Sequence, residues 1–177
     1  SSTSPASIVN SFVRDASGNM YWTDREAKGG PAIRKRSPDG AITTLLQDGP
    51  AWASVVDHLA ASYQGARVDV VVGVESRGFI FGGALAHQLQ AGFVPVRKRG
   101  KLPARTIEEE YELEYGRDVL AIHEDAIRPG QRVLAVDDLL ATGGTMAATL
   151  RLVERLGGTV VGAAFLIELG FFRGRER

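Results

Sequence analysis

The stretch Val133-Leu134-Ala135-Val136-Asp137-Asp138-Leu139-Leu140-Ala141-Thr142-Gly143-Gly144-Thr145 decides the fold of this 177-residue chain. Its first four residues are apolar, which predicts a strand that is buried on both faces. Two aspartates follow where such a strand ends, and a small loop containing glycines comes after them. A helical pattern over residues 146–156 follows, and two glycines end it.

A strand, a glycine loop and a helix in this order form a common phosphate site in α/β proteins. The amides of the loop residues and the helix N-terminus point at the anion, which predicts contacts from Ala141, Thr142, Gly143, Gly144 and Thr145. The loop lacks the Gly-Lys-Ser/Thr ending of a Walker A motif and the Gly-x-Gly-x-x-Gly of a dinucleotide site. Ionised carboxylates only accept hydrogen bonds, so the adjacent Asp137 and Asp138 suit the vicinal hydroxyls of a ribose. The stretch therefore predicts a site for ribose 5-phosphate.

The composition of the chain excludes several other functions. Its length suits one domain with a hydrophobic core, and its formal net charge is zero. Neither a nucleic-acid nor a membrane partner is therefore expected. The chain contains no cysteine, so no disulfide framework and no thiol chemistry are possible. We expect a soluble, cytoplasmic protein.

Strand and helix patterns alternate through most of the chain. Further apolar runs over residues 68–74, 93–96 and 159–167 predict strands, and residues 52–63 and 80–90 have helical patterns. Such alternation predicts an α/β fold, with a parallel sheet covered by helices on both faces.

The first 40 residues have a different pattern from the rest. Turn signals at residues 15–19 and 37–40 predict two hairpins, the second closed by a strand over residues 41–45. Residues 1–7 are expected to be disordered. The segment is similar to one repeat of an NHL-type β-propeller. We expect a β-rich appended segment over residues 1–40 and the main domain over residues 41–177.

A second motif, Glu75-Ser76-Arg77-Gly78, also lies where a predicted strand meets a predicted helix. Ligands in open α/β sheets bind outside the carboxyl ends of the strands, so both motifs should face one crevice. Arg77, with nearby backbone amides, suits a second anion. A surface arginine paired with a nearby acid is the alternative.

A run of cations, Arg97-Lys98-Arg99-Gly100-Lys101, follows the next predicted strand. Its like charges repel each other, which favours an anion bound beside them, although a solvated face is equally consistent with the pattern. The acidic run over residues 108–110 is expected to be solvated.

These motifs occur in the order found in the type I phosphoribosyltransferases, and residues 42–177 resemble the adenine phosphoribosyltransferases in particular. In that family residues 75–82 correspond to the pyrophosphate loop, in which the peptide after Glu75 is often cis. Residues 111–116 are similar to the flexible catalytic lid. The resemblance implies catalytic roles for Glu114, Arg77 and Lys101. It implies substrate binding by Glu75, Ser76, Arg97, Lys98, Tyr115 and Leu169, besides the acid pair and the loop that follows it.

The chain also departs from the family pattern. Gly40-Ala41 stands where the family usually has a Phe-Arg-Asp-type segment near the base, and the family usually continues beyond Arg177 into one more strand. We therefore expect a domain that is truncated at its C-terminus.

The resemblance implies a specific reaction. Adenine and 5-phosphoribosyl 1-pyrophosphate would give AMP and pyrophosphate in purine salvage. It also implies Mg²⁺ held mainly through the substrate, with no protein metal site, and a homodimer. Two alternatives stay open: a regulatory module that binds a nucleotide or sugar phosphate without turnover, and a phosphoribosyltransferase for another purine.

Overall fold

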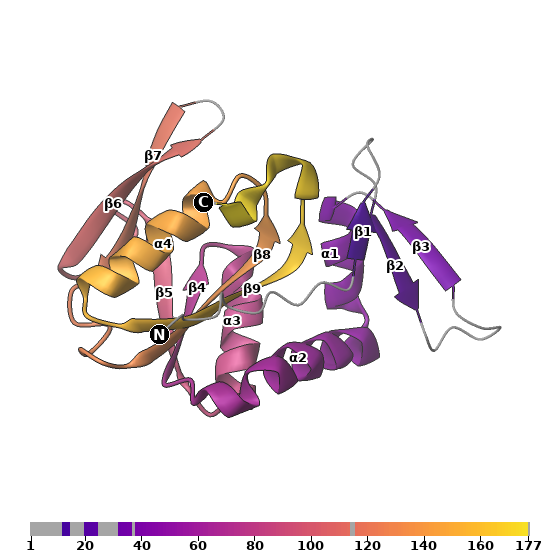
Figure 1. Cartoon of the computed structure of the whole chain (residues 1–177), viewed down its shortest axis with the longest axis horizontal. Coiled ribbons are helices and arrows are strands. Elements are labelled where there is room, and N and C mark those ends of the chain that lie inside the picture. Colours follow the sequence, from indigo (N-terminus) through magenta and orange to yellow (C-terminus); the bar gives the residue numbers. More distant parts are fainter. Residues whose placement is uncertain (1–11, 15–19, 25–31, 37, 114–115, 177) are drawn as a thin grey trace.

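The computed structural model describes residues 12–14, 20–24, 32–36, 38–113 and 116–176. The larger of two sheets has six strands in the order β6-β7-β5-β4-β8-β9 (Figure 1). A separate three-stranded sheet contains the strands nearest the N-terminus.

Four neighbouring strands form the parallel part of the large sheet, which confirms the predicted fold class. Their order is β5-β4-β8-β9, and their bounds are Gly92–Lys98, Val70–Val74, Arg132–Leu140 and Thr159–Glu168. A hairpin of β6 (Thr106–Leu113) and β7 (Gly116–His123) extends one edge, where β7 pairs antiparallel with β5. Because β4 and β8 are adjacent and parallel, the motifs at their carboxyl ends lie at one edge of the sheet.

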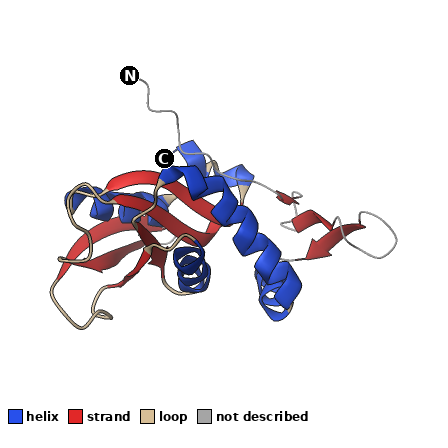
Figure 2. Ribbon diagram, turned by 90° about the horizontal axis from the view of Figure 1, so that it is seen from below, coloured by secondary structure: helices blue, strands red, loops and turns tan. Residues whose placement is uncertain are grey.

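Helices cover both faces of the sheet (Figure 2). One face packs against α1 (Pro38–Gln47), α2 (Gly49–Tyr63) and α3 (Arg77–Gln88), and the other packs against α4 (Gly144–Arg155). Strand β8 shows why residues 133–136 are all apolar. Leu134 belongs to the hydrophobic core beneath α1, α2 and α3, whereas Val133 belongs to the core beneath α4, and neither is accessible to solvent.

The N-terminal strands confirm one predicted hairpin and correct the other. Strand β1 (Phe12–Arg14) pairs antiparallel with β2 (Met20–Asp24), around the turn signal at residues 15–19, and β2 pairs with β3 (Ala32–Arg36). The strand expected over residues 41–45 is wrong, because these residues belong to α1. The expected disorder of residues 1–7 lies outside the described residues.

Packing explains why α1 is a helix. Pro38 begins it, at a position where proline is tolerated. Ile42 is fully buried, and Leu45 and Leu46 pack against the same core, so the apolar positions recur at helical spacing. Burial of this face outweighs the β propensity of the Ile-Thr-Thr segment. In the parts of the chain that the structure describes, no helix is both long enough and apolar enough to cross a membrane.

Candidate active site

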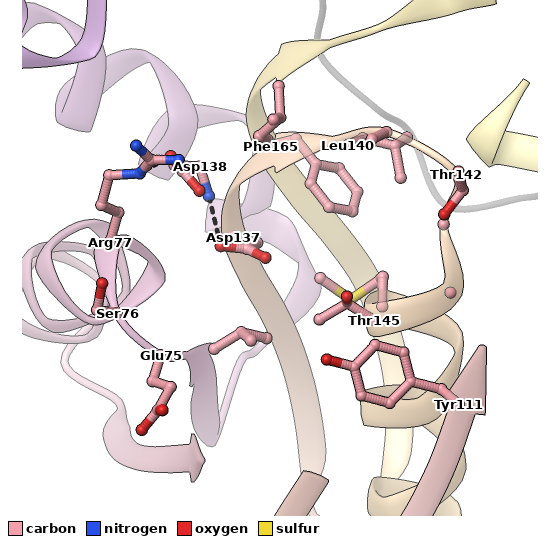
Figure 3. Close-up of a pocket in the computed structure, with 16 residues that line it drawn as sticks. Glu75, Ser76, Arg77, Tyr111, Asp137, Asp138, Leu140, Thr142, Thr145 and Phe165 are labelled. Atoms are coloured by element: carbon pink, nitrogen blue, oxygen red, sulfur yellow. Dashed lines mark hydrogen bonds and ion pairs between the residues drawn. The ribbon is translucent and has the colours of Figure 1, made fainter. Parts of the chain in front are cut away.

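The carboxyl ends of β4 and β8 border a cavity of about 400 Å³ (Figure 3). It is lined by Glu75, Ser76 and Arg77 from one motif, and by Asp137, Asp138 and the loop Ala141–Thr145 from the other. The prediction that both motifs face one crevice is confirmed.

Asp137 and Asp138 lie side by side at the end of β8, and their environments differ. The side chain of Asp138 is buried and forms an ion pair with the guanidinium of Arg77. The backbone N–H of Asp138 donates a hydrogen bond to Oδ1 of Asp137, at 2.8 Å. Burial and then the neighbouring Asp138 carboxylate raise the pKa of Asp137 well above its usual value. The pair therefore offers carboxylate oxygens at a partly desolvated site, with one arginine beside them.

The loop after the acid pair presents a helix N-terminus to the cavity. Gly143 adopts a left-handed conformation with φ of +81°, and α4 begins at the next residue. No described side chain caps this end of α4, although the N–H of Ala147 bonds the carbonyl of Gly143 at 2.8 Å. The first amides of the helix are thus open to an anion, and the helix dipole favours negative charge there.

The second motif begins with a cis peptide bond between Glu75 and Ser76, as the resemblance implies. Arg97 donates from Nε to one oxygen of the Glu75 carboxylate at 2.7 Å, and Lys101 donates from Nζ to the other at 2.9 Å. Burial alone would raise the pKa of Glu75, but the hydrogen bonds and charges of Lys101 and Arg97 outweigh it and hold the pKa below its usual value. Glu75 therefore anchors two of the predicted cations beside the cavity.

The cationic run is neutralised within the protein. Besides the two cations on Glu75, Lys98 pairs with Asp118 at 2.7 Å, and Arg99 donates to Glu108 at 2.8 Å. Arg97, Lys98 and Lys101 are not among the residues that line the cavity. Their predicted contact with the pyrophosphate stays a prediction.

The acidic run was expected to be solvated, and this is wrong for Glu109, whose side chain is only 20% exposed. It accepts hydrogen bonds from Arg151 at 2.6 Å and from Arg155 at 2.9 Å. Both arginines project from α4, so Glu109 ties β6 to that helix.

Tyr111 lines the cavity, although no role was predicted for it. It is buried, and burial raises the pKa of its hydroxyl, while a hydrogen bond with the Thr145 side chain partly offsets the effect. Ile107, Glu109 and Tyr111 alternate along β6 and face α4, so a two-residue period over 106–113 would have indicated this position. Apolar lining residues were also missed: Val74, Leu139, Leu140, Met146 and Phe165.

Three predicted residues lie elsewhere or outside the described residues. Leu169 is buried in the core at the end of β9, and its N–H donates to the carbonyl of Leu140 at 2.8 Å. Glu114 and Tyr115 fall outside the described residues. Within the described ranges, no three histidine, aspartate or glutamate side chains gather as a metal site would require.

Comparisons with known proteins agree with this geometry. A family model described as a phosphoribosyl transferase domain matches residues 43–175. An adenine phosphoribosyltransferase of Acidobacterium capsulatum is 62% identical over 136 residues, which cover 77% of this chain and 75% of that protein. The crystal structure of adenine phosphoribosyltransferase from Rhodothermus marinus is 50% identical with a TM-score of 0.75, and the match covers 89% of this chain and 86% of that one. The Saccharomyces cerevisiae enzyme, crystallised with adenine and an imino-altritol bisphosphate, is 35% identical with a TM-score of 0.75, and 88% of each chain is covered.

Proposed function

Because the chain belongs to the phosphoribosyltransferase family, we propose that it acts as an adenine phosphoribosyltransferase. It transfers the phosphoribosyl group of 5-phosphoribosyl 1-pyrophosphate to adenine, and it releases AMP and pyrophosphate in purine salvage. One observation supports this function most strongly. The acid pair, the N-terminus of α4 and residues 75–77 all line the same cavity. We assign the reaction to residues 41–177 and regard residues 1–40 as an appended segment.

The sugar phosphate is proposed to bind along the end of β8. Its 5-phosphate would accept hydrogen bonds from the amides of the loop Ala141–Thr145, which the dipole of α4 reinforces. The ribose hydroxyls would donate to Asp137 and Asp138. Two fixed contacts on one rigid strand orient the anomeric carbon for attack, which supplies much of the catalytic advantage.

The pyrophosphate is proposed to lie toward the second motif. A nitrogen of adenine attacks the anomeric carbon while the bond to pyrophosphate breaks, so negative charge grows on the leaving group. Arg77 and Ser76 border the cavity, and Arg97 and Lys101 form ion pairs with Glu75 beside it. Lys98 belongs to the same cationic group. Donors placed where charge develops stabilise the transition state.

The base is proposed to be handled by the lid. Glu114 would take the proton that adenine loses, and Tyr115 would cover the base when the lid closes.

We propose that Mg²⁺ enters with the substrate. Mg²⁺ keeps several waters and binds readily to substrate phosphates, so it would be held mainly through the phosphates and hydroxyls of 5-phosphoribosyl 1-pyrophosphate. When bound, it neutralises charge on the leaving pyrophosphate.

We further propose a homodimer in the cytoplasm. Two large apolar side chains, Ile80 on α3 and Phe93 on β5, are exposed, and Phe79 packs edge-to-face on Phe93. Exposed apolar groups of this kind favour a protein partner. The charged sugar phosphate does not cross a membrane unaided, which favours the compartment where it is made.

A turnover assay tests the function. Radiolabelled adenine is incubated with 5-phosphoribosyl 1-pyrophosphate and Mg²⁺, and the expected products are labelled AMP and pyrophosphate. Hypoxanthine, guanine and xanthine serve as competing bases and are expected to react far more slowly. Binding without product would identify a sensing module, and faster turnover of another purine would reassign the base; either result would overturn the proposal.

A further inference from the structure

The C-terminal turns pack directly on the loop that follows the acid pair. These turns are η2 (Gly170–Phe172) and η3 (Gly174–Glu176), and they lie beyond β9 (Figure 1). A Cβ atom on Gly174 would collide with the carbonyl oxygen of Ala141 and would come within 3.0 Å of the Leu140 side chain. A Cβ atom on Gly143 would in turn collide with the carbonyl of Gly174. The two backbones are therefore in contact, with no space for a side chain between them.

Several interactions fix the position of these turns. The N–H of Leu169 bonds the Leu140 carbonyl at 2.8 Å, and Phe172 packs against the hydrophobic core. Arg175 donates from Nε to the Glu168 carboxylate at 2.7 Å. The turns are thus attached to the ends of both β8 and β9, and they can act as a rigid support behind the loop.

Space, and not backbone conformation, requires glycine at position 174. Gly143 has a positive φ, which disfavours any other residue there. Gly174 does not have a positive φ, so alanine could adopt its backbone conformation. Gly170 in the neighbouring turn also has an ordinary φ, and a Cβ atom there would meet no atom within 4 Å. Gly170 is therefore a matched control for Gly174.

We propose that Gly174 is a positioning residue for the sugar-phosphate substrate. Without a side chain, it lets the C-terminal turn support residues 141–143, so that the loop presents the first amides of α4 to the 5-phosphate. A methyl group at this position must push the Ala141 carbonyl and the loop away from the turn. The inference rests on the proposed function, because that function assigns the 5-phosphate to this loop.

The test compares Gly174→Ala with Gly170→Ala. Gly174→Ala should raise the KM for 5-phosphoribosyl 1-pyrophosphate and the Kd for ribose 5-phosphate by about 10- to 100-fold, the scale of a small misplacement of a binding group. The KM for adenine and the fold, followed by circular dichroism, should change little. Gly170→Ala should match the wild type in every measurement.

Unchanged ribose 5-phosphate affinity in Gly174→Ala would overturn the inference, as would equal losses for adenine and sugar phosphate. If Gly174→Ala does not fold, Arg175→Gln replaces it. This change loosens the turn without inserting an atom and should raise the same Kd by a smaller factor, whereas an unchanged Kd would overturn the inference. Calorimetry with ribose 5-phosphate also separates the two proposals. A wild type that binds this ligand but makes no AMP would refute the proposed function alone, and a wild type that does not bind it would overturn the role of Gly174.

Discussion

Asp137 is one of two adjacent carboxylates at the end of a buried strand, a placement that costs stability. Burial and the neighbouring Asp138 raise its pKa in the folded state well above the unfolded value near 3.8. The folded state therefore binds more protons than the unfolded state above about pH 4, and the free energy of unfolding falls as the pH rises through the raised pKa. A residue that weakens the fold at neutral pH is a candidate for a functional role.

Asp137→Asn should therefore stabilise the protein at neutral pH. The amide is uncharged, and its oxygen can still accept the N–H of Asp138. The unfolding temperature should rise at pH 7.5, by about 2–4 °C for each kcal/mol recovered, and the gain should shrink near pH 4. Differential scanning calorimetry at both pH values measures this. A lower unfolding temperature at pH 7.5 would show that the carboxylate stabilises the fold.

Removing the carboxylates should weaken substrate binding, although removing that of Asp137 should stabilise the fold. Asp137→Asn combined with Asp138→Asn should weaken 5-phosphoribosyl 1-pyrophosphate binding, because two charged acceptors for the ribose hydroxyls are lost, each contributing about 1.5–3 kcal/mol. Isothermal titration calorimetry is the measurement. Asp57→Asn, at an exposed position on α2, is the control. Equal affinity in the double variant and the control would remove the acid pair from the binding site.

Arg77 borders the cavity next to Asp138 and is proposed to stabilise the leaving pyrophosphate. Arg77→Ala should lower kcat by an order of magnitude or more, on the scale of about 2–4 kcal/mol for one donor to a developing anion. Steady-state kinetics with both substrates varied would decide this. Arg128→Ala, on an exposed turn, should leave kcat unchanged. An effect of Arg77→Ala confined to the KM for adenine would place Arg77 at the wrong end of the site.

Among the elements, those with a strong pattern could be predicted from the sequence. Strand β8 was predictable from its continuous apolar run, and helix α4 from apolar residues that recur at helical spacing. Helix α1 was not, because its β-branched residues favour a strand and only the distant core on which Ile42 packs makes it a helix. Contacts between distant parts of the chain also limited the prediction of the site. The acid pair and the loop could be identified as local motifs, whereas Tyr111 joins the cavity through a hairpin whose pairing the sequence does not specify.

The β6–β7 hairpin contributes Tyr111 to the cavity, and side-chain ion pairs anchor β6. Glu109 holds β6 to α4, and the preceding residue, Glu108, pairs with Arg99. Surface ion pairs of this kind contribute little individually, so they hold β6 only weakly.

Ligands should slow hydrogen exchange in the segment that includes β6. Amide exchange across residues 101–116 should slow when 5-phosphoribosyl 1-pyrophosphate and an unreactive adenine analogue are both bound. Glu114→Gln should retain sugar-phosphate binding but lose turnover, since the amide cannot take a proton. Glu112→Gln, at an exposed position two residues away, should remain active. Equal exchange in every liganded state, with full activity of Glu114→Gln, would contradict a lid.

Across the whole molecule, positive and negative charges balance in number, and the cations near the end of β5 also have acidic partners beside them. The net charge is zero, and the cations at the end of β5 and just after it pair with carboxylates on β6, on β7 and in the turn after β4. The charge clusters therefore need no partner protein. Exposed large apolar side chains, in contrast, favour a partner, because an interface would remove them from water.

The proposed homodimer makes the final prediction. Among the described residues, the exposed large apolar side chains are Ile80, Phe93 and Phe171, with 46%, 37% and 65% of their surface exposed. The first two belong to α3 and β5, and in a twofold dimer the same face of both copies would bury them together. Ile80→Asp should place a charge in that interface and halve the mass measured by light scattering. Ala61→Asp, at an exposed position on α2, should leave the mass unchanged. A dimer that survives Ile80→Asp would have to use another face, and a monomeric wild type would exclude the dimer altogether.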